Sequence, residues 1–168
     1  MRKKTRKIAL LGVLTSVALV LSYLEVMLPP ISTAVPGIKM GLPNIIIIFV
    51  LYKFSVKHAV LVSLLRVVMV TLLFGNAMVF IYSFAGAVLS ICIMSILKRI
   101  NQFSVIGISV LGAVSHNVGQ TIVAIIILQT KEIAFYMIPL LISGIVAGIL
   151  IGILGGLLIK RFKKIKLC

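Results

Sequence analysis

A polar cluster interrupts the longest apolar stretch of this chain, Phe103 to Leu128. The cluster consists of Ser115, His116, Asn117, Gly119 and Gln120. Because about 20 apolar residues suffice to cross a bilayer, this stretch is long enough to span one. A histidine and two amides at that depth find no hydrogen-bond partners in lipid, so they need partners from protein, water or a ligand. The cluster is therefore a candidate surface for binding a molecule with hydrogen-bonding groups.

Helical spacing aligns a set of small and polar residues with this cluster. On one helix face it would place Ser109, Gly112, Ala113, His116 and Gln120, with Asn117 beside them. Such a groove suits a small ligand, but the same polar groups could instead form hydrogen bonds between helices of a membrane bundle. A single histidine without a second histidine or cysteine nearby is a poor metal site. The sequence therefore predicts no metal ion and no other cofactor.

Arg66 is a positive charge in the middle of another apolar segment, residues 56–74. An arginine at the centre of a membrane helix costs roughly 2.5–3.5 kcal/mol on insertion scales. It therefore needs a carboxylate, backbone carbonyl groups or an anionic ligand as its partner. Glu25 is its only plausible carboxylate, because the chain contains two acidic residues in total, both glutamates. A structural pair with Glu25 and the binding of an anion both remain open for Arg66.

A proline- and glycine-rich segment, residues 29–43, joins the first two apolar segments. Its composition predicts a structured outer loop that folds back over the helices. Lys39 could offer its charge and nearby backbone N–H groups to an anion, although a structured connector explains the loop equally well. The predicted substrate-binding set is completed by Asn44, Tyr82 and Ser83, which fall with Glu25 toward the outer side. Tyr82 is also simply explained as an aromatic residue at the membrane interface.

The elements that position these residues are apolar helices. Hydrophobic residues make up 62% of the chain and its mean hydropathy is +1.32, against about 45–50% apolar residues in soluble domains. The sequence therefore predicts an all-α integral membrane protein with a single domain, residues 1–168. Its six predicted transmembrane helices cover residues 8–28, 42–52, 56–74, 77–97, 103–128 and 133–159. The second is short, so it is a tilted or partial helix, or it begins within the preceding loop.

The last apolar segment contains a regular repeat of glycines. Gly144, Gly148, Gly152 and Gly156 recur every four residues. Such a run of small residues lets two helix backbones approach closely. Packing within the bundle is the simplest interpretation, and docking of a membrane partner is the alternative.

The basic residues are placed asymmetrically along the chain, which carries a net charge of +15. With a cytoplasmic N-terminus, only Lys39 and Lys131 of the 17 Lys and Arg residues face outward, and only Arg66 lies within a span. The positive-inside rule then predicts a multi-pass protein of the cell membrane with both termini in the cytoplasm. Charges at the ends of apolar segments suit membrane lipid rather than nucleic acid. A cleaved signal peptide is a competing interpretation of residues 1–28, but no small-residue cleavage pattern precedes Pro29.

The scarcity of carboxylates excludes several classes of enzyme. Aspartate-rich magnesium sites, paired-carboxylate hydrolysis and two-metal sites all need more acidic ligands than two glutamates provide. No glycine–lysine loop of the Walker A type is present, so any ATP-driven step must come from a partner. We therefore expect that the chain is not an enzyme and that it binds a small anionic or carbonyl-bearing molecule without covalent chemistry.

Four segments carry a resemblance that extends over nearly the whole chain. They are Pro36–Asn44, Ser63–Arg66, Tyr82–Gly86 and Ser109–Gln120. With these motifs the chain resembles the bacterial membrane family labelled Gx transporter or heptaprenyl diphosphate synthase component I. It is also similar in size and layout to the S components of energy-coupling-factor (ECF) transporters, six-helix proteins that bind vitamins from outside.

The resemblance to S components implies substrate binding for the uptake of a vitamin, cofactor or precursor. Gly12 and Ser16 would then dock a transmembrane coupling subunit, and cytoplasmic ATPases would drive transport. The synthase label implies an alternative, a noncatalytic membrane subunit associated with heptaprenyl or polyprenyl diphosphate synthesis for quinone side chains. A membrane scaffold within a redox assembly is a third possibility.

Overall fold

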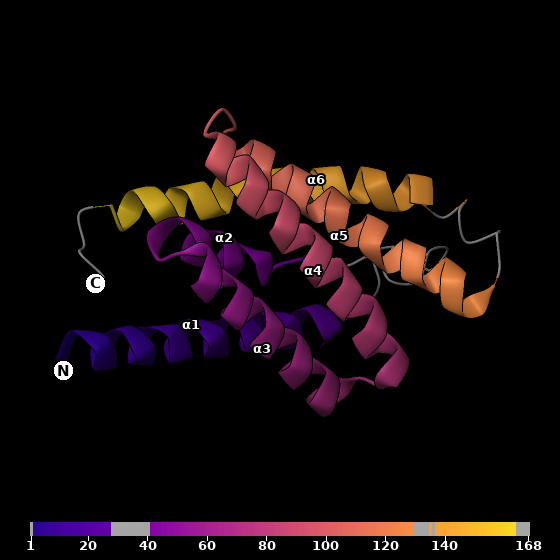
Figure 1. Cartoon of the computed structure of the whole chain (residues 1–168), viewed down its shortest axis with the longest axis horizontal. Coiled ribbons are helices and arrows are strands. Elements are labelled where there is room, and N and C mark those ends of the chain that lie inside the picture. The colour runs from indigo at the N-terminus through magenta and orange to yellow at the C-terminus, as the bar shows by residue number, and fades with distance from the viewer. Residues whose placement is uncertain (1, 28–40, 130–134, 136, 164–168) are drawn as a thin grey trace.

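The regular structure of the computed structural model is helical throughout the residues that it describes, which are 2–27, 41–129, 135 and 137–163. These residues form six main helices (Figure 1). They are α1 (Arg2–Met27), α2 (Asn44–Lys53), α3 (Val56–Phe74), α4 (Ala77–Ile100), α5 (Val105–Leu128) and α6 (Met137–Arg161). The prediction of an all-α chain with six helices is thereby confirmed.

Five of the described helices, all except α2, are long and apolar enough to cross a membrane. With ten residues, α2 rises about 15 Å at 1.5 Å per residue, half of a hydrocarbon core of about 30 Å. Of the two readings of the second predicted helix, the partial helix is the one that its length supports. We call α2 the half-helix below.

The outward surface of the long helices is apolar. Ile8 is 71% exposed, Leu72 is 75% exposed and Ile126 is 67% exposed. Side chains of this kind are unfavourable in water but are well accommodated by lipid tails. The exposure pattern therefore agrees with a multi-pass membrane protein.

Local sequence explains where several helices begin and end. The side chains of Asn76 and Ser104 each accept a hydrogen bond from the backbone N–H three residues later, at 2.9 and 3.1 Å. Each thereby caps the start of the helix that follows it. Asn101 and Gln129 follow the ends of α4 and α5 in the left-handed backbone conformation that closes many helices. The cap at Ser104 explains why α5 begins two residues after the predicted Phe103.

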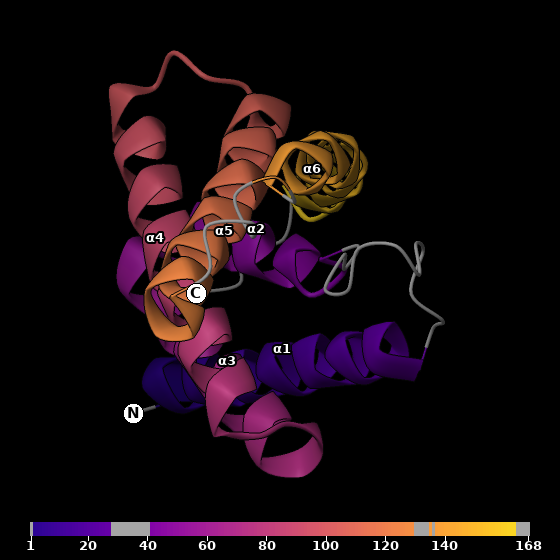
Figure 2. The same cartoon turned by 90° about the vertical axis from the view of Figure 1, so that its right-hand side faces the viewer.

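The helices can be divided into two groups of three. The most extensive contacts join α4 to α5 and α5 to α6, while α1, α2 and α3 contact one another in the second group. Between the groups, α3 packs on α4 and α2 packs on α6 at least as extensively. Figure 2 shows the half-helix between α6 and the pair α1 and α3. Its seven residues from Ile45 to Leu51 are all buried, as expected for a helix that is hydrophobic on every side. The half-helix is thus a buried core element that packs between α6 and the pair α1 and α3.

Most of the glycine repeat in α6 packs against α5. The packed residues are Gly144, Gly148 and Gly152. A Cβ atom added at Gly148 would lie 2.6 Å from Cα of Val110, a distance that real Cβ atoms do not tolerate. This confirms the interpretation of the repeat as internal packing. The fourth glycine, Gly156, differs because an added Cβ atom would meet nothing within 4 Å.

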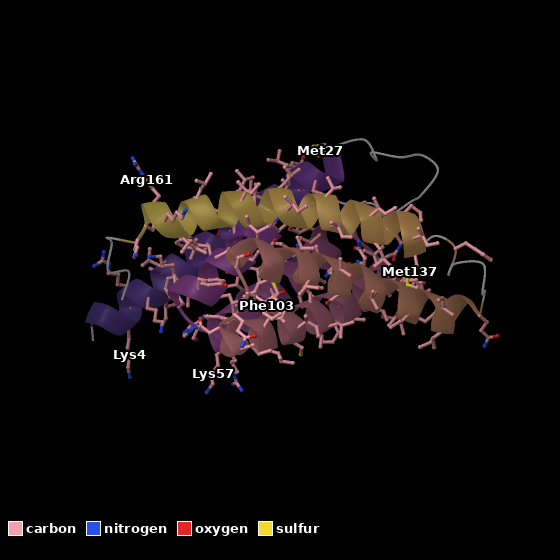
Figure 3. The ribbon with its side chains drawn as sticks, turned by 90° about the horizontal axis from the view of Figure 1, so that it is seen from above. Lys4, Met27, Lys57, Phe103, Met137 and Arg161 are labelled. Carbon is pink, nitrogen blue, oxygen red and sulfur yellow. The ribbon has the colours of Figure 1, made fainter. Side chains whose placement is uncertain are left out.

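The beginning of α1 and the end of α6 lie at the same end of the bundle. Lys4, Lys57 and Arg161 gather there, whereas Met27 and Met137 lie toward the opposite end (Figure 3). We call the end with Lys4, Lys57 and Arg161 the basic end. Within it, Nζ of Lys53 donates a hydrogen bond to the carbonyl of Phe162 at 2.7 Å. The common position of these two helix ends agrees with the predicted topology, and the side of the membrane that they face stays a prediction.

Candidate functional site

A cavity lies between the two groups of helices, and all six helices contribute to its wall. It is displaced from the basic end, because its residues on α3 run from Arg66 to Thr71, beyond the helix midpoint. Its volume is about 80 Å³, whereas a single water needs roughly 10–15 Å³ on this kind of measure. The cavity therefore has room for several waters or for one small polar group of a ligand.

The cavity brings together most of the residues predicted to bind substrate. Those that line it are Glu25, Asn44, Arg66, Ser83, His116, Asn117 and Gln120. Tyr82 is partly buried but does not belong to the cavity lining. Lys39 and most of the loop at 29–43 lie outside the described residues. The structure thus establishes proximity for seven of these residues, and their role in binding substrate stays a prediction.

Arg66 and Glu25 both face this cavity and interact electrostatically. The Nε atom of Arg66 is buried, and within the described residues it has no hydrogen-bond partner. Glu25 accepts a hydrogen bond from the backbone N–H of Gly41, which lies three residues before the start of the half-helix. The carboxylate of Glu25 therefore accepts the hydrogen bond from Gly41 and also interacts with the positive charge of Arg66.

Gly41 makes this contact possible through its backbone conformation. Its φ angle of +70° lies in the left-handed region, which glycine adopts without steric cost. A Cβ atom there would lie 3.2 Å from Nδ2 of Asn44 and 3.2 Å from Cδ1 of Ile151. The carbonyl of Gly41 also accepts from the N–H of Asn44 at 2.8 Å. One glycine therefore links Glu25 to the start of the half-helix.

His116 and Gln120 are held at the cavity by close packing of α5 on α4. A Cβ atom added at Gly86 would lie 2.8 Å from the backbone oxygen of His116 and 2.8 Å from Cγ of Gln120. At Gly119, on the same side of α5, it would lie 3.0 Å from the carbonyl oxygen of Ala85. Glycines on both helices thus permit the approach that positions the histidine and the amide.

Asn117 joins α5 to α6 as well as lining the cavity. Its Nδ2 donates a hydrogen bond to the backbone carbonyl of Leu140 at 2.7 Å. Gly144 provides the space, because a Cβ atom there would lie 2.8 Å from Nδ2. Asn117 therefore forms a hydrogen bond between helices, which was the alternative interpretation of the polar cluster. Ser115, in contrast, donates to Leu111 within its own helix at 2.6 Å.

The predicted stripe of small and polar residues on α5 divides between two surroundings. Ala113, His116 and Gln120 line the cavity. Ser109 does not line it, and its buried hydroxyl has no hydrogen-bond partner among the described residues. Gly112 packs beneath Met94 of α4, whose side chain would lie 2.7 Å from an added Cβ atom. Helical spacing placed these residues on one helix correctly, but it could not separate the walls of the cavity from the packing contacts.

Sequence reasoning missed two polar residues of the lining, Ser22 and Thr71. Ser22 lies three residues before Glu25, so helical spacing from that glutamate could have identified it. Its hydroxyl donates to the carbonyl of Ala18 at 2.9 Å. The apolar lining residues Val67 and Val70 resemble every other valine of the apolar segments. No signal in a single sequence distinguishes these valines.

The residues predicted to dock a coupling subunit lie on an open side of α1. Gly12 and Ser16 are both exposed. A Cβ atom added at Gly12 would meet nothing within 4 Å, and the hydroxyl of Ser16 donates to the carbonyl of Gly12 at 3.1 Å. The surface is therefore accessible, and docking itself stays a prediction.

The described residues of the cavity wall offer one guanidinium, one carboxylate, one imidazole and several amides and hydroxyls. No three His, Cys, Asp or Glu side chains within the described residues are grouped closely enough to hold a metal ion. Charge and hydrogen bonding are the means by which such a wall can hold a ligand.

Comparison with known proteins gives one result for the chain as a whole. The family model described as heptaprenyl diphosphate synthase component I matches residues 14–158. The matched range contains every residue that lines the cavity. Neither the curated proteins nor the solved structures contain a match.

Proposed function

The chain belongs to the heptaprenyl diphosphate synthase component I family, and we propose that it is a noncatalytic membrane subunit associated with polyprenyl diphosphate synthesis. The observation that carries this proposal is the extent of the family match, residues 14–158, which includes the cavity and all or most of each helix. The absence of aspartate from the sequence supports the noncatalytic part. A synthase that needs aspartate-bound magnesium must therefore supply that chemistry from another subunit.

In this role the cavity holds a small molecule without reacting with it. Arg66, His116 and Gln120 can bind polar groups through charge and hydrogen bonds. The displacement of the cavity from the basic end keeps it apart from the surface on which a soluble cytoplasmic partner would meet the predicted inner face. Binding at the cavity and assembly with a partner would therefore use different surfaces.

Co-purification tests the proposed association. The full-length chain, tagged and extracted from its native membrane in mild detergent, should carry with it a soluble prenyl diphosphate synthase rich in aspartate. Removal of the membrane chain should lower the membrane-associated activity of that synthase while leaving its active site intact. Recovery of ATPases and a transmembrane coupling subunit, with no synthase, would contradict the proposal.

The position of the cavity favours a second candidate, the substrate-binding component of an uptake transporter that resembles an ECF S component. If the basic end faces the cytoplasm, as the positive-inside rule predicts, the cavity lies in the outer half of the membrane. A vitamin, cofactor or precursor could then enter from outside. Gly12 and Ser16, which are exposed on α1, would provide the surface for a coupling subunit.

Ligand-dependent stability tests whether the polar cluster binds a molecule in either role. Native mass spectrometry of the gently purified protein would first identify a retained molecule, which then serves as the probe. The double variant His116→Ala and Asn117→Ala should lose the rise in melting temperature that this molecule gives to the original protein. Ser115→Ala is the matched control, because Ser115 bonds within its own helix. An unchanged rise in the double variant would remove the cluster from the binding site.

A further inference from the structure

Arg66 lines the cavity and contains a buried donor that has no hydrogen-bond partner among the described residues. Its Nε is buried and, within the part of the chain that the structure describes, donates no hydrogen bond to the protein. Leaving a charged donor unsatisfied away from water is unfavourable. The guanidinium group of Arg66 therefore has unused capacity to donate hydrogen bonds, and Arg66 is the lining residue beside which we expect a ligand group to bind.

The half-helix α2 directs its N-terminus toward the same cavity. Gly41 and Asn44 line the cavity, whereas Lys53, the last residue of α2, lies at the basic end and donates to the carbonyl of Phe162. The N-terminus of α2 therefore lies inside the bundle. Aligned peptide dipoles give a helix N-terminus a partial positive charge, and membrane half-helices that end in this way favour anionic groups.

The backbone N–H groups at this terminus are already used. Those of Asn44, Ile45 and Ile46 donate to the carbonyls three residues earlier, at 2.8, 3.2 and 3.1 Å. The terminus therefore attracts an anion by its charge rather than by direct hydrogen bonds. The direct donors must be side chains, and Asn44 and Gln120 supply amides beside Arg66 in the cavity wall.

The charges around the cavity favour an anion over a neutral group. Within the described lining, Glu25 supplies the negative charge and Arg66 the positive charge of the ionisable pair. The partial positive charge at the start of α2 adds to the positive side of this balance. Glu25 also receives the N–H of Gly41, which stabilises its negative form in place.

We infer that the cavity holds one oxyanion, the carboxylate or phosphate end of its ligand, with the guanidinium group of Arg66 as the anchor. This inference rests on the noncovalent binding proposed above and names the chemical group that is bound. A volume of about 80 Å³ has room for one such group. The remainder of the ligand extends out of the cavity.

The test uses the full-length protein in nanodiscs of uncharged phosphatidylcholine, with acetate, acetamide and inorganic phosphate as probes at constant ionic strength. Acetate and acetamide have nearly the same shape, but only acetate is charged. Acetate or phosphate should raise the melting temperature with a saturable dependence on concentration, and acetamide should not. Equal stabilisation by acetate and acetamide would overturn the inference, and so would no stabilisation by either anion.

Substitution of Arg66 tests the anchor. Arg66→Gln should raise the half-saturating anion concentration about tenfold or more, as expected for the loss of a charged hydrogen bond. Arg161→Gln is the control, because it removes an exposed arginine at the basic end. Unchanged anion binding in Arg66→Gln would overturn the assignment. If Arg66→Gln does not fold, Gln120→Leu should weaken binding severalfold, and the comparison of acetate with acetamide in the original protein still decides the inference.

A further pair of probes distinguishes the source of the anion. Decyl phosphate should bind more tightly than inorganic phosphate if the ligand is an amphiphile that enters from the lipid. Similar binding of the two would assign the group to a water-soluble molecule. Loss of anion binding would leave the co-purified synthase unaffected, so failure of this inference is distinguishable from failure of the proposed association.

Discussion

Asn117 shows how one side chain in a membrane bundle serves both packing and a cavity. Its amide links α5 to the carbonyl of Leu140 in α6, and it also lines the cavity. The carbonyl of Leu140 has a second side-chain donor, since the hydroxyl of Ser143 lies 2.9 Å away. If the amide of Asn117 is removed, the carbonyl of Leu140 therefore still accepts a hydrogen bond from Ser143.

We expect Asn117→Ala to lower the free energy of unfolding by about 0.5–1 kcal/mol, the scale of single interhelical hydrogen bonds in membrane proteins. Unfolding by a denaturing detergent from lipid micelles would measure it. Ser115→Ala on the same turn should change the free energy by less, because its hydroxyl bonds to its own helix. Equal losses in the two variants would show that the link between α5 and α6 is not what stabilises the protein.

The types of the residues allowed the polar part of the cavity lining to be predicted, but not its apolar part. Arg66, His116 and Gln120 were predictable because polar groups are costly at membrane depth and stand out in an apolar sequence. Val67 and Val70 were not, because an apolar lining residue has the same composition as a lipid-facing one. Tyr82 and Ser83 are neighbours in sequence, but only Ser83 lines the cavity, since successive helical residues point in directions about 100° apart.

At the scale of elements, the surroundings of the glycines distinguish two positions along α6. Gly148 allows the helix backbone to approach Val110, whereas Gly156 meets nothing within 4 Å. The same residue type therefore has opposite consequences eight residues apart on one helix.

Gly148→Ala should destabilise the protein by about 1–3 kcal/mol, because the added methyl group would overlap the α5 backbone. Gly156→Ala is the matched control and should be neutral or stabilise by up to about 1 kcal/mol, the difference in helix propensity. Detergent-induced unfolding of the two variants measures both effects. A similar change in both would contradict close packing of α6 on α5.

Lys98 stabilises the end of the half-helix. Its Nζ donates to the carbonyl of Leu51 and lies 5.3 Å from the ring centroid of Tyr52. Positive charge is favourable at a helix C-terminus, and the contact with the ring adds to it.

We expect Lys98→Met to lower the melting temperature, with a loss of about 1–2 kcal/mol from the hydrogen bond and the ring contact together. Arg99→Met removes the same charge from the next residue, which is exposed. Its effect should remain within about 0.5 kcal/mol. Equal destabilisation would indicate that net charge, rather than the contact with α2, is responsible.

Most helix bounds were predictable to within about three residues, because apolar length and breaks between segments determine them, whereas α1 begins six residues before the predicted 8–28, at Arg2. The predicted bounds of α3, 56–74, agree with the structure at both ends. The predicted start of α6 at 133 falls among residues outside the described part of the chain. Side-chain contacts such as that of Lys98 with Leu51 were beyond prediction, because they depend on how α2 lies against α4.

At the scale of the whole molecule, the cavity lies where two groups of three helices meet. Arg66 and Glu25 belong to one group, and His116 and Gln120 belong to the other. A bound ligand group would therefore bridge the two groups. The sequence suggested the individual residues, but this division depends on packing between distant segments and could not be predicted from periodicity.

The topology of the whole molecule is tested by single cysteines in a variant without Cys92 and Cys168. A membrane-impermeant maleimide added to intact cells should label Phe135→Cys, since Phe135 is 79% exposed near the end of the bundle opposite the basic one. Lys4→Cys and Arg161→Cys should react only after the membrane is opened. Labelling of Arg161→Cys in intact cells would contradict the predicted cytoplasmic position of the basic end.

The short length of α2 has a consequence for biosynthesis. The half-helix packs against α3, which follows it directly, and against α6, which is synthesised much later. A helix of ten residues cannot hold itself across the hydrocarbon layer, so α2 cannot reach its final position at the time it emerges from the ribosome. It reaches its final packed position only after α6 has been inserted and can contact it. The second helix in the chain is therefore among the last to reach its packed position. The cavity at its N-terminus forms only when synthesis is nearly complete.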